Sequence, residues 1–95
     1  MSAISPQLLA MLRCPATRMP LELADDQLVQ AVNQRIARRE IRNQAGEVLE
    51  TRLDGGLVRS DRQGLYPIVD GIPILLVDEF VSLEQLPAEV RGQPG

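Results

Sequence analysis

The apolar segment at residues 65–77 constrains the fold most, because it predicts two short strands joined by a tight turn. Asp70 and Gly71 interrupt the segment with residues that favour turns, so residues 65–68 and 72–77 would form an antiparallel hairpin. Nearly every residue of the second strand is apolar, which indicates that both of its faces are covered. A chain of 95 residues has little material for that cover, so we expect a partner protein or a second copy of the chain to supply part of it.

Two prolines restrict where these strands can lie in a sheet. Pro67 and Pro73 have no backbone N–H to donate to a neighbouring strand. Each is therefore expected at a strand end, at a bulge or at an edge of the sheet. The sequence thus predicts an open sheet edge close to the hairpin.

Two helices and a first strand are predicted before the hairpin. Ser5 and Pro6 favour the start of a short N-terminal helix, which should end by Cys14 because Pro15 follows it. The alternation of apolar and polar residues at 21–23 predicts a brief strand. Acidic residues at positions 25 and 26, followed by apolar residues at three- and four-residue spacing, predict a second helix over about residues 25–39.

The region between that helix and the hairpin predicts more of the sheet. Residues 47–53 have the composition of a strand, and Gly55 and Gly56 would form the turn into a returning strand at residues 57–59. Residues 60–64 predict another turn, and residues 78–86 a short closing helix. The predicted fold class is α+β, with a small antiparallel sheet, the N-terminal helix and an inserted helical segment at about residues 24–45. Residues 1–86 would form a single domain and residues 87–95 a flexible C-terminal tail.

The composition excludes several classes of function. The formal net charge is −3 and all ten basic residues are arginine, which makes a direct nucleic-acid-binding surface unlikely. Histidine is absent, so Ser-His-Asp and Cys-His catalysis and histidine-based metal sites are excluded. Cys14 has no second cysteine to pair with and the chain begins without a signal-peptide pattern, so a cytoplasmic location is expected. No apolar run approaches the ~20 residues that cross a bilayer, so no membrane partner is expected.

Two motifs carry a resemblance to a known family. Residues 8–15 read Leu-Leu-x-x-Leu-x-Cys-Pro, and residues 66–76 read Tyr-Pro-Ile-x-x-Gly-Ile-Pro-x-Leu-Leu. With these motifs the sequence resembles the Trm-one-twelve family of small activator subunits of S-adenosylmethionine-dependent methyltransferases, together with its short bacterial YcaR-like relatives. The resemblance implies a zinc-ribbon-like sheet, and the predicted helix at residues 25–39 lies where longer members of the family carry insertions.

The zinc ligands that the resemblance implies are mostly missing. Members that bind zinc carry two cysteine pairs, and only Cys14 is retained here, whereas Thr17, Arg59 and Arg62 stand at the other three positions. A guanidinium group is permanently charged and has no lone pair to offer a metal ion. We therefore expect that the zinc is lost, and that hydrogen bonds and packing join the two halves of the former site. In this arrangement Arg59 or Arg62 would pair with Asp61 or Glu22, and Cys14 would be a buried small hydrophobic residue.

The resemblance also implies a function, which is docking onto a methyltransferase by strand addition and an apolar patch. The protein would be a non-catalytic subunit without a cofactor that activates or stabilises a methyltransferase acting on the translation machinery. The candidate partner-binding residues are those of the second hairpin strand with two leucines of the N-terminal segment: Pro73, Ile74, Leu75, Leu76 and Val77, with Leu8 and Leu12.

Three other functions stay open at this point. A stand-alone nucleic-acid-binding or ribosome-associated module without metal would need a contiguous arginine surface, built from Arg35, Arg38, Arg39, Arg59 and Arg62. The exposed strand could instead form a homodimer. A small enzyme is the least supported alternative, because only carboxylates and a single thiol are present as reactive groups.

Overall fold

The computed structural model describes Gln7 and residues 11–86. The predicted N-terminal helix lies largely outside these residues, and so do Leu8 and the predicted tail at residues 87–95.

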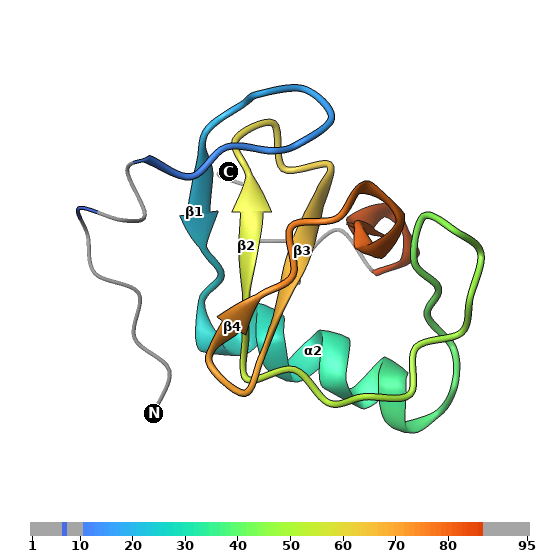
Figure 1. Cartoon of the computed structure of the whole chain (residues 1–95). Coiled ribbons are helices and arrows are strands. Elements are labelled where there is room, and N and C mark those ends of the chain that lie inside the picture. The colour runs from blue at the N-terminus through green and yellow to red at the C-terminus, as the bar shows by residue number, and fades with distance from the viewer. Residues whose placement is uncertain (1–6, 8–10, 87–95) are drawn as a thin grey trace.

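The described residues form a small α+β structure with one curled antiparallel sheet, which agrees with the predicted class (Figure 1). The strand order is β1-β2-β3-β4, and β5 also pairs with β3, along the same edge as β4. Two 3-10 turns, Val77–Glu79 and Leu83–Gln85, flank β5. The regular elements are β1 (Leu21–Leu23), α2 (Asp26–Ala37), β2 (Gly55–Arg59), β3 (Gly64–Val69), β4 (Ile72–Pro73) and β5 (Val81–Ser82).

Helix α2 confirms the helix predicted over residues 25–39. Asp25 is its N-cap, and the Asp25 carboxylate accepts a hydrogen bond of 2.8 Å from the backbone N–H of Leu28. Leu28, Val32 and Ile36 are the buried residues of the helix and lie on one face, as their spacing predicts. At the C-terminal end, the N–H of Glu40 donates to the carbonyl of Arg35 over 2.9 Å, which satisfies one of the last helical carbonyls.

Arg39 closes α2 in a left-handed conformation, with φ of 59°. A side chain with a Cβ is disfavoured in this conformation by about 1 kcal/mol relative to glycine. We expect the substitution Arg39→Gly to raise the free energy of unfolding by about 0.5 to 1 kcal/mol, measured by urea denaturation. Arg38→Gly is the control, because Arg38 has a right-handed backbone with φ of −93°. An equal gain in both variants would show that the conformation of Arg39 is not the cause.

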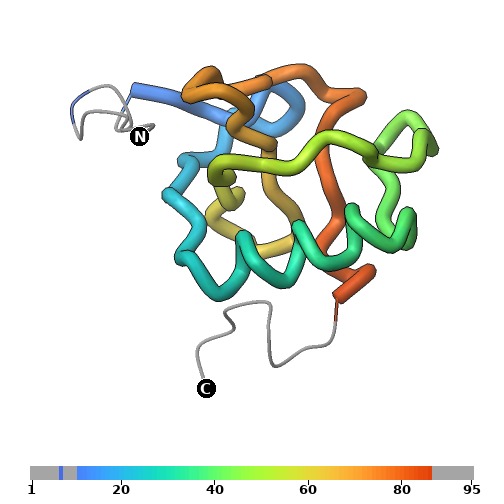
Figure 2. The backbone as a smooth tube through the Cα atoms, turned by 90° about the horizontal axis from the view of Figure 1, so that it is seen from below, coloured from blue at the N-terminus to red at the C-terminus, as the bar shows by residue number. Residues whose placement is uncertain are grey.

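The sheet separates two buried clusters. Along β2 and β3 successive residues face opposite sides, so Val58 and Leu65 pack with α2, whereas Leu57 and Tyr66 pack on the other face. Figure 2 shows α2 along one side of the sheet and the loop at residues 12–20 on the opposite side. The second cluster, which we call the loop-side cluster, consists of Cys14, Leu21, Leu57, Tyr66, Ile68 and Phe80.

The predicted strand at residues 47–53 and the predicted Gly55-Gly56 turn are wrong. Within that segment only Val48 forms a β-bridge, with Arg42. The C-terminal end of the segment is hydrogen-bonded to α2 instead of to a strand. The side chain of Asn33 on α2 accepts from the N–H of Leu53 and donates to its carbonyl, at 2.8 and 2.9 Å. This draws the chain along α2 and out of the sheet. Gly56 lies inside β2, where a Cβ would stand only 3.2 Å from the Leu65 side chain.

The hairpin turn at Asp70 and Gly71 is confirmed, with φ of 52° and 76°. The strand predicted at residues 72–77 ends at Pro73, so the prediction is wrong for residues 74–77. Strand β4 covers one part of the edge of β3, and β5 pairs with another part of that edge. Leu75 leaves the strand direction and packs against the loop-side cluster. The closing helix predicted at residues 78–86 is replaced by β5 and the two 3-10 turns.

The two prolines differ in position. Pro73 lies at the end of β4, as predicted, but Pro67 lies within the central strand β3, against the prediction. The Pro67 carbonyl accepts a hydrogen bond of 2.9 Å from the N–H of Ile74, so it faces the edge of β3 that pairs with β4 and β5. The nitrogen and the carbonyl of one strand residue face the same edge, so the Pro67 nitrogen also faces away from β2. Pro67 therefore removes no hydrogen bond from the ladder between β2 and β3.

Within the described residues, no helix combines the length and the apolar character needed to cross a membrane.

Candidate functional site

Two tight turns carry the four positions at which the resemblance to the Trm-one-twelve family implies zinc ligands. In the first turn the N–H of Arg18 donates to the carbonyl of Cys14, and in the second the N–H of Arg62 donates to the carbonyl of Arg59, both over 2.8 Å. Arg18 and Arg62 both adopt the left-handed conformation, with φ of 64° and 62°. The first turn is closed by a hydrogen bond between residues four apart and the second by one between residues three apart, and the side chain of Arg59 lies close to Cys14.

Cys14 lies in the centre of this site and is buried, with 1% of its surface exposed, as the sequence predicts. Its Sγ is 2.9 Å from the hydroxyl of Tyr66 on β3. Burial opposes ionisation of the thiol, but hydrogen bonds from the Thr17 and Tyr66 hydroxyls and from the backbone of Thr17 and Ala16 outweigh it. Together they lower the pKa of Cys14 from 9.0 to about 7. Burial and the hydrogen bond to Cys14 raise the pKa of Tyr66 well above its usual value.

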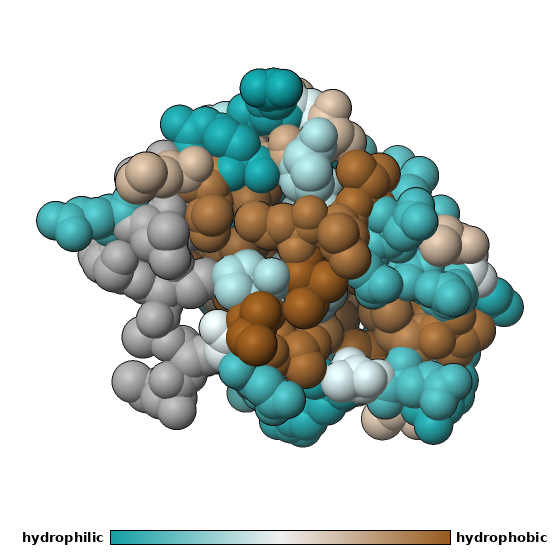
Figure 3. Space-filling model, in the orientation of Figure 1, coloured by the Kyte–Doolittle hydropathy of each residue, from teal (hydrophilic) through white to brown (hydrophobic). Residues whose placement is uncertain are grey.

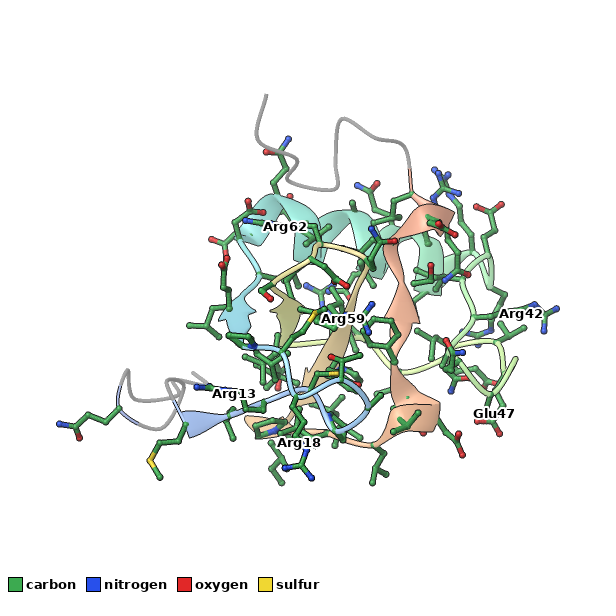
Figure 4. All side chains as sticks on the ribbon, turned by 90° about the horizontal axis from the view of Figure 1, so that it is seen from above. Arg13, Arg18, Arg42, Glu47, Arg59 and Arg62 are labelled. Carbon is green, nitrogen blue, oxygen red and sulfur yellow. The ribbon has the colours of Figure 1, made fainter. Side chains whose placement is uncertain are left out.

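Arg59 joins the thiol to a carboxylate. Its Nε donates to Asp61 Oδ1 over 2.8 Å, and its guanidinium also lies close enough to Cys14 for the two groups to interact electrostatically. The Asp61 carboxylate holds the pKa of Arg59 above its usual value, and Arg59 holds that of Asp61 below its own. The guanidinium carbon is 4.7 Å from the centroid of the Phe80 ring, a cation–π distance. In Figure 4, which looks down on the molecule from above, Arg59 lies near the centre of the view.

Arg62 makes the second expected ion pair. Its Nη2 lies 3.4 Å from Glu22 Oε2, which links the second turn to β1. The expectation that Arg59 and Arg62 pair with Asp61 and Glu22 is therefore confirmed. The contact between Cys14 and Tyr66, 52 residues apart, was not foreseen from the sequence.

The donor set of this site does not fit a zinc ion. Cys14 offers one thiol and Thr17 one hydroxyl, whereas the two remaining positions carry guanidinium groups, which repel cations and cannot coordinate. In the part of the chain that the structure describes, no group of three or more His, Cys, Asp or Glu residues is placed to hold a metal ion. The site is therefore a network of hydrogen bonds and an ion pair, surrounded by buried apolar residues.

A second feature is an apolar surface around β4. It consists of three large exposed side chains, which we call the β4 surface: Ile72, Leu76 and Val77, exposed to 61%, 61% and 45%. Leu23 on β1 is exposed to 50%, but it lies at the opposite end of the strand order. Figure 3 shows hydrophobic residues gathered in the centre of the face seen in Figure 1. Isolated exposed apolar residues are common, whereas a group of this kind is a candidate interaction surface.

The predicted partner-binding residues divide between this surface and the interior. Leu76 and Val77 belong to the β4 surface, whereas Leu12, Pro73, Ile74 and Leu75 are half-buried. Leu12 and Leu75 pack against the loop-side cluster. Leu23 and Ile72 were not among the predicted site residues. The Leu-Glu-Leu pattern of β1 could have indicated Leu23, since a short edge strand has little to cover its outer end.

The arginine residues expected for a nucleic-acid surface are partly engaged by carboxylates. Arg59 and Arg62 are paired as above, and Arg35 Nη1 lies 4.0 Å from Glu40 Oε1. Three of the five arginines that a nucleic-acid surface would need are therefore next to carboxylates. This placement gives no support to the nucleic-acid-binding alternative.

Comparison with known proteins identifies one relative by structure. No family model matches the sequence, and no curated protein matches it. The fold is similar to the solution NMR structure of XF2673 from Xylella fastidiosa, with 30% sequence identity and a TM-score of 0.68 over 86% of this chain and 84% of that chain. The class of protein is a small α+β domain with a curled antiparallel sheet. The chain belongs to the same family as XF2673.

Proposed function

We propose that this protein is a non-catalytic cytoplasmic subunit that binds a methyltransferase dependent on S-adenosylmethionine and activates or stabilises it. The enzyme would act on the translation machinery, as the resemblance to the Trm-one-twelve family implies. The observation that carries the proposal is the β4 surface, where Ile72, Leu76 and Val77 expose large apolar side chains within six consecutive residues. Covering them with a partner would remove apolar area from water, which is the main driving force of association.

The sheet edge beside this surface supports the same mode of binding. Strand β4 has only two residues and lies at the end of the strand order, so its outer edge is open to an added strand. Main-chain hydrogen bonds along such an edge give affinity, and the neighbouring apolar side chains give selectivity. Ile72 lies in β4 itself and is one of the most exposed residues of the surface.

The two turns at the former zinc site support a zinc-ribbon-like origin. Each turn ends in a residue with the left-handed backbone conformation. One turn contributes Cys14 and the other Arg59, and these two side chains meet at the centre of the site. In our proposal the network of Cys14, Tyr66, Arg59 and Asp61 takes the place of the metal and keeps the loop at residues 12–20 on the sheet. The partner surface is thereby held in place without a metal ion.

The proposal predicts capture of a specific class of enzyme. The wild-type protein, used as bait in the native cytosol, should retain a methyltransferase dependent on S-adenosylmethionine at about equimolar amount. The double variant Ile72→Asp and Leu76→Asp should lose it, because two buried carboxylates at the interface would be left without partners. Both residues are exposed, so the variant should fold normally.

The control carries the same change in charge away from the β4 surface. Gln27→Asp with Gln34→Asp alters two exposed residues of α2 and should capture the enzyme as well as the wild type does. Equal capture by all three proteins would reject the interface. Recovery of no methyltransferase, or of a second copy of the bait alone, would reject the function.

A further inference from the structure

A groove lies beside the hairpin that the chain forms around Arg42 and Val48. Its volume is about 700 Å3, and it runs between residues 47–53 on one side and Pro67, Val69, Ile74 and Glu79 on the other. Leu49, Leu53, Val69 and Ile74 contribute its apolar lining. A hydrogen bond of 3.2 Å from the N–H of Ala45 to the carbonyl of Asp78 ties the two walls together. The size is that of clefts which hold ligands in other proteins.

The charged residues that line this groove are all acidic. They are Glu47, Glu50 and Glu79, and no arginine is among the lining residues. Glu47 is held in place by hydrogen bonds with Asn43, whereas the side chain of Arg42, the nearest cation on the hairpin, donates to the carbonyl of Gly46 over 2.7 Å. Figure 4 shows Glu47 and Arg42 on this hairpin, well apart from Arg59. An occupant that complements the groove must therefore combine apolar with basic groups.

The backbone along one wall is available for hydrogen bonding. In the described part of the chain, the N–H groups of Glu50 and Thr51, which line the groove, make no hydrogen bond, although those of Leu49 and Leu53 do. Both of these lining residues, Glu50 and Thr51, are exposed. An exposed pair of free donors beside an apolar groove matches the way proteins bind extended peptide segments, with main-chain bonds on one side and side-chain pockets on the other.

We propose that this groove binds an extended peptide segment of a partner protein in which apolar residues alternate with lysine or arginine. The apolar side chains enter between Leu49, Val69 and Ile74, and the basic ones face Glu47, Glu50 and Glu79. This inference does not rest on the methyltransferase proposal, because none of the residues that line the groove belongs to the β4 surface. RNA is not the occupant, since phosphates would meet three carboxylates.

The experiment uses the whole chain and a labelled six-residue peptide of alternating valine and lysine, with binding followed by fluorescence anisotropy. We expect saturable binding, and no binding of the matched peptide of alternating valine and glutamate. The double variant Glu50→Lys and Glu79→Lys should weaken binding at least tenfold. Glu22→Lys with Glu40→Lys changes the net charge equally outside the groove and should leave the affinity within about twofold, since exposed ion pairs contribute little.

A second measurement locates the peptide on the protein. Amide shifts in a 15N spectrum should change at residues 50–53 and at Val69 and Ile74 on addition of the valine–lysine peptide, and remain unchanged at Leu23 and Leu76. Equal weakening in both double variants would mean attraction by net charge alone and would overturn the proposal. Shifts confined to the β4 surface, absence of binding, or binding of an RNA oligonucleotide at these residues would overturn it as well.

Discussion

Replacing Gly64 with alanine is expected to destabilise the protein by about 3 kcal/mol, a large share of the stability of a domain of this size. Gly64 begins β3 directly beneath the ring of Phe80. A Cβ at this position would lie 2.2 Å from Phe80 Cζ and 2.6 Å from the backbone oxygen of Val81. Phe80 is held by Tyr66, whose ring centroid is 5.0 Å away, and by Arg59, so it cannot move without disturbing the polar network. The measurement is the free energy of unfolding from urea denaturation.

Gly55→Ala is the matched control for this substitution. Gly55 also lies in a strand, but its added Cβ would be 3.6 Å from the Ile68 side chain, an ordinary van der Waals contact. Its effect should stay below about 1 kcal/mol. A loss of stability as small in Gly64→Ala as in Gly55→Ala would show that β3 and β5 are not packed as described.

The second large effect expected is a dependence of stability on pH that comes from Cys14. The folded protein holds the pKa of this thiol at about 7, against 9.0 for an unperturbed thiol. Because the folded pKa is the lower one, the stabilisation is complete above pH 9, decreases as the pH falls, and is lost below pH 7. Two pKa units correspond to about 2 to 3 kcal/mol in the free energy of unfolding between pH 6 and pH 9. Above about pH 10 the raised pKa of Tyr66 reverses the trend, because ionisation of the phenol then favours the unfolded chain.

Cys14→Ser separates the thiol from other causes of pH dependence. The serine hydroxyl can still hydrogen-bond Tyr66 and does not ionise in this range, so the rise in stability from pH 7 to pH 9 should disappear. Urea denaturation of both proteins at pH 6, 7, 8 and 9 measures this directly. The interpretation of the network fails if the wild type and the variant show the same pH profile.

The elements with a strong local signal could be predicted from the sequence. Asp25 is the N-cap of α2, and Leu28, Val32 and Ile36 form its buried face, because capping and helical spacing act within a few residues. The turn at Asp70 and Gly71 likewise follows from residues that tolerate positive φ.

The elements decided by packing could not be predicted in this way. Gly55 and Gly56 were assigned to a turn because glycine favours turns, but Gly56 lies in β2, where a larger residue would press on Leu65. Residues 74–77 have the composition of a strand, but it is β5 that pairs with the other end of β3. Leu75 packs against the loop-side cluster instead. Both outcomes depend on contacts between distant parts of the chain, which a local pattern does not contain.

The same distinction holds for the site. The ion pairs of Arg59 and Arg62 could be predicted because the motif positions indicated where these side chains meet. The role of Tyr66 as a partner of Cys14 depends on β3 passing beneath the loop at residues 12–20. Exposure of Leu23 and Ile72 became evident only once the lengths of β1 and β4 were known.

The central claim is that the β4 surface binds and activates a methyltransferase, and purified components test it most directly. The measurement is the affinity of the captured enzyme for S-adenosylmethionine, determined by titration calorimetry alone, with the wild-type protein, and with the variant Ile72→Asp and Leu76→Asp. The account predicts tighter binding of the methyl donor with the wild type and no change with the variant. The same affinity in the presence and absence of the wild-type protein, or equal enhancement by the variant, would contradict it.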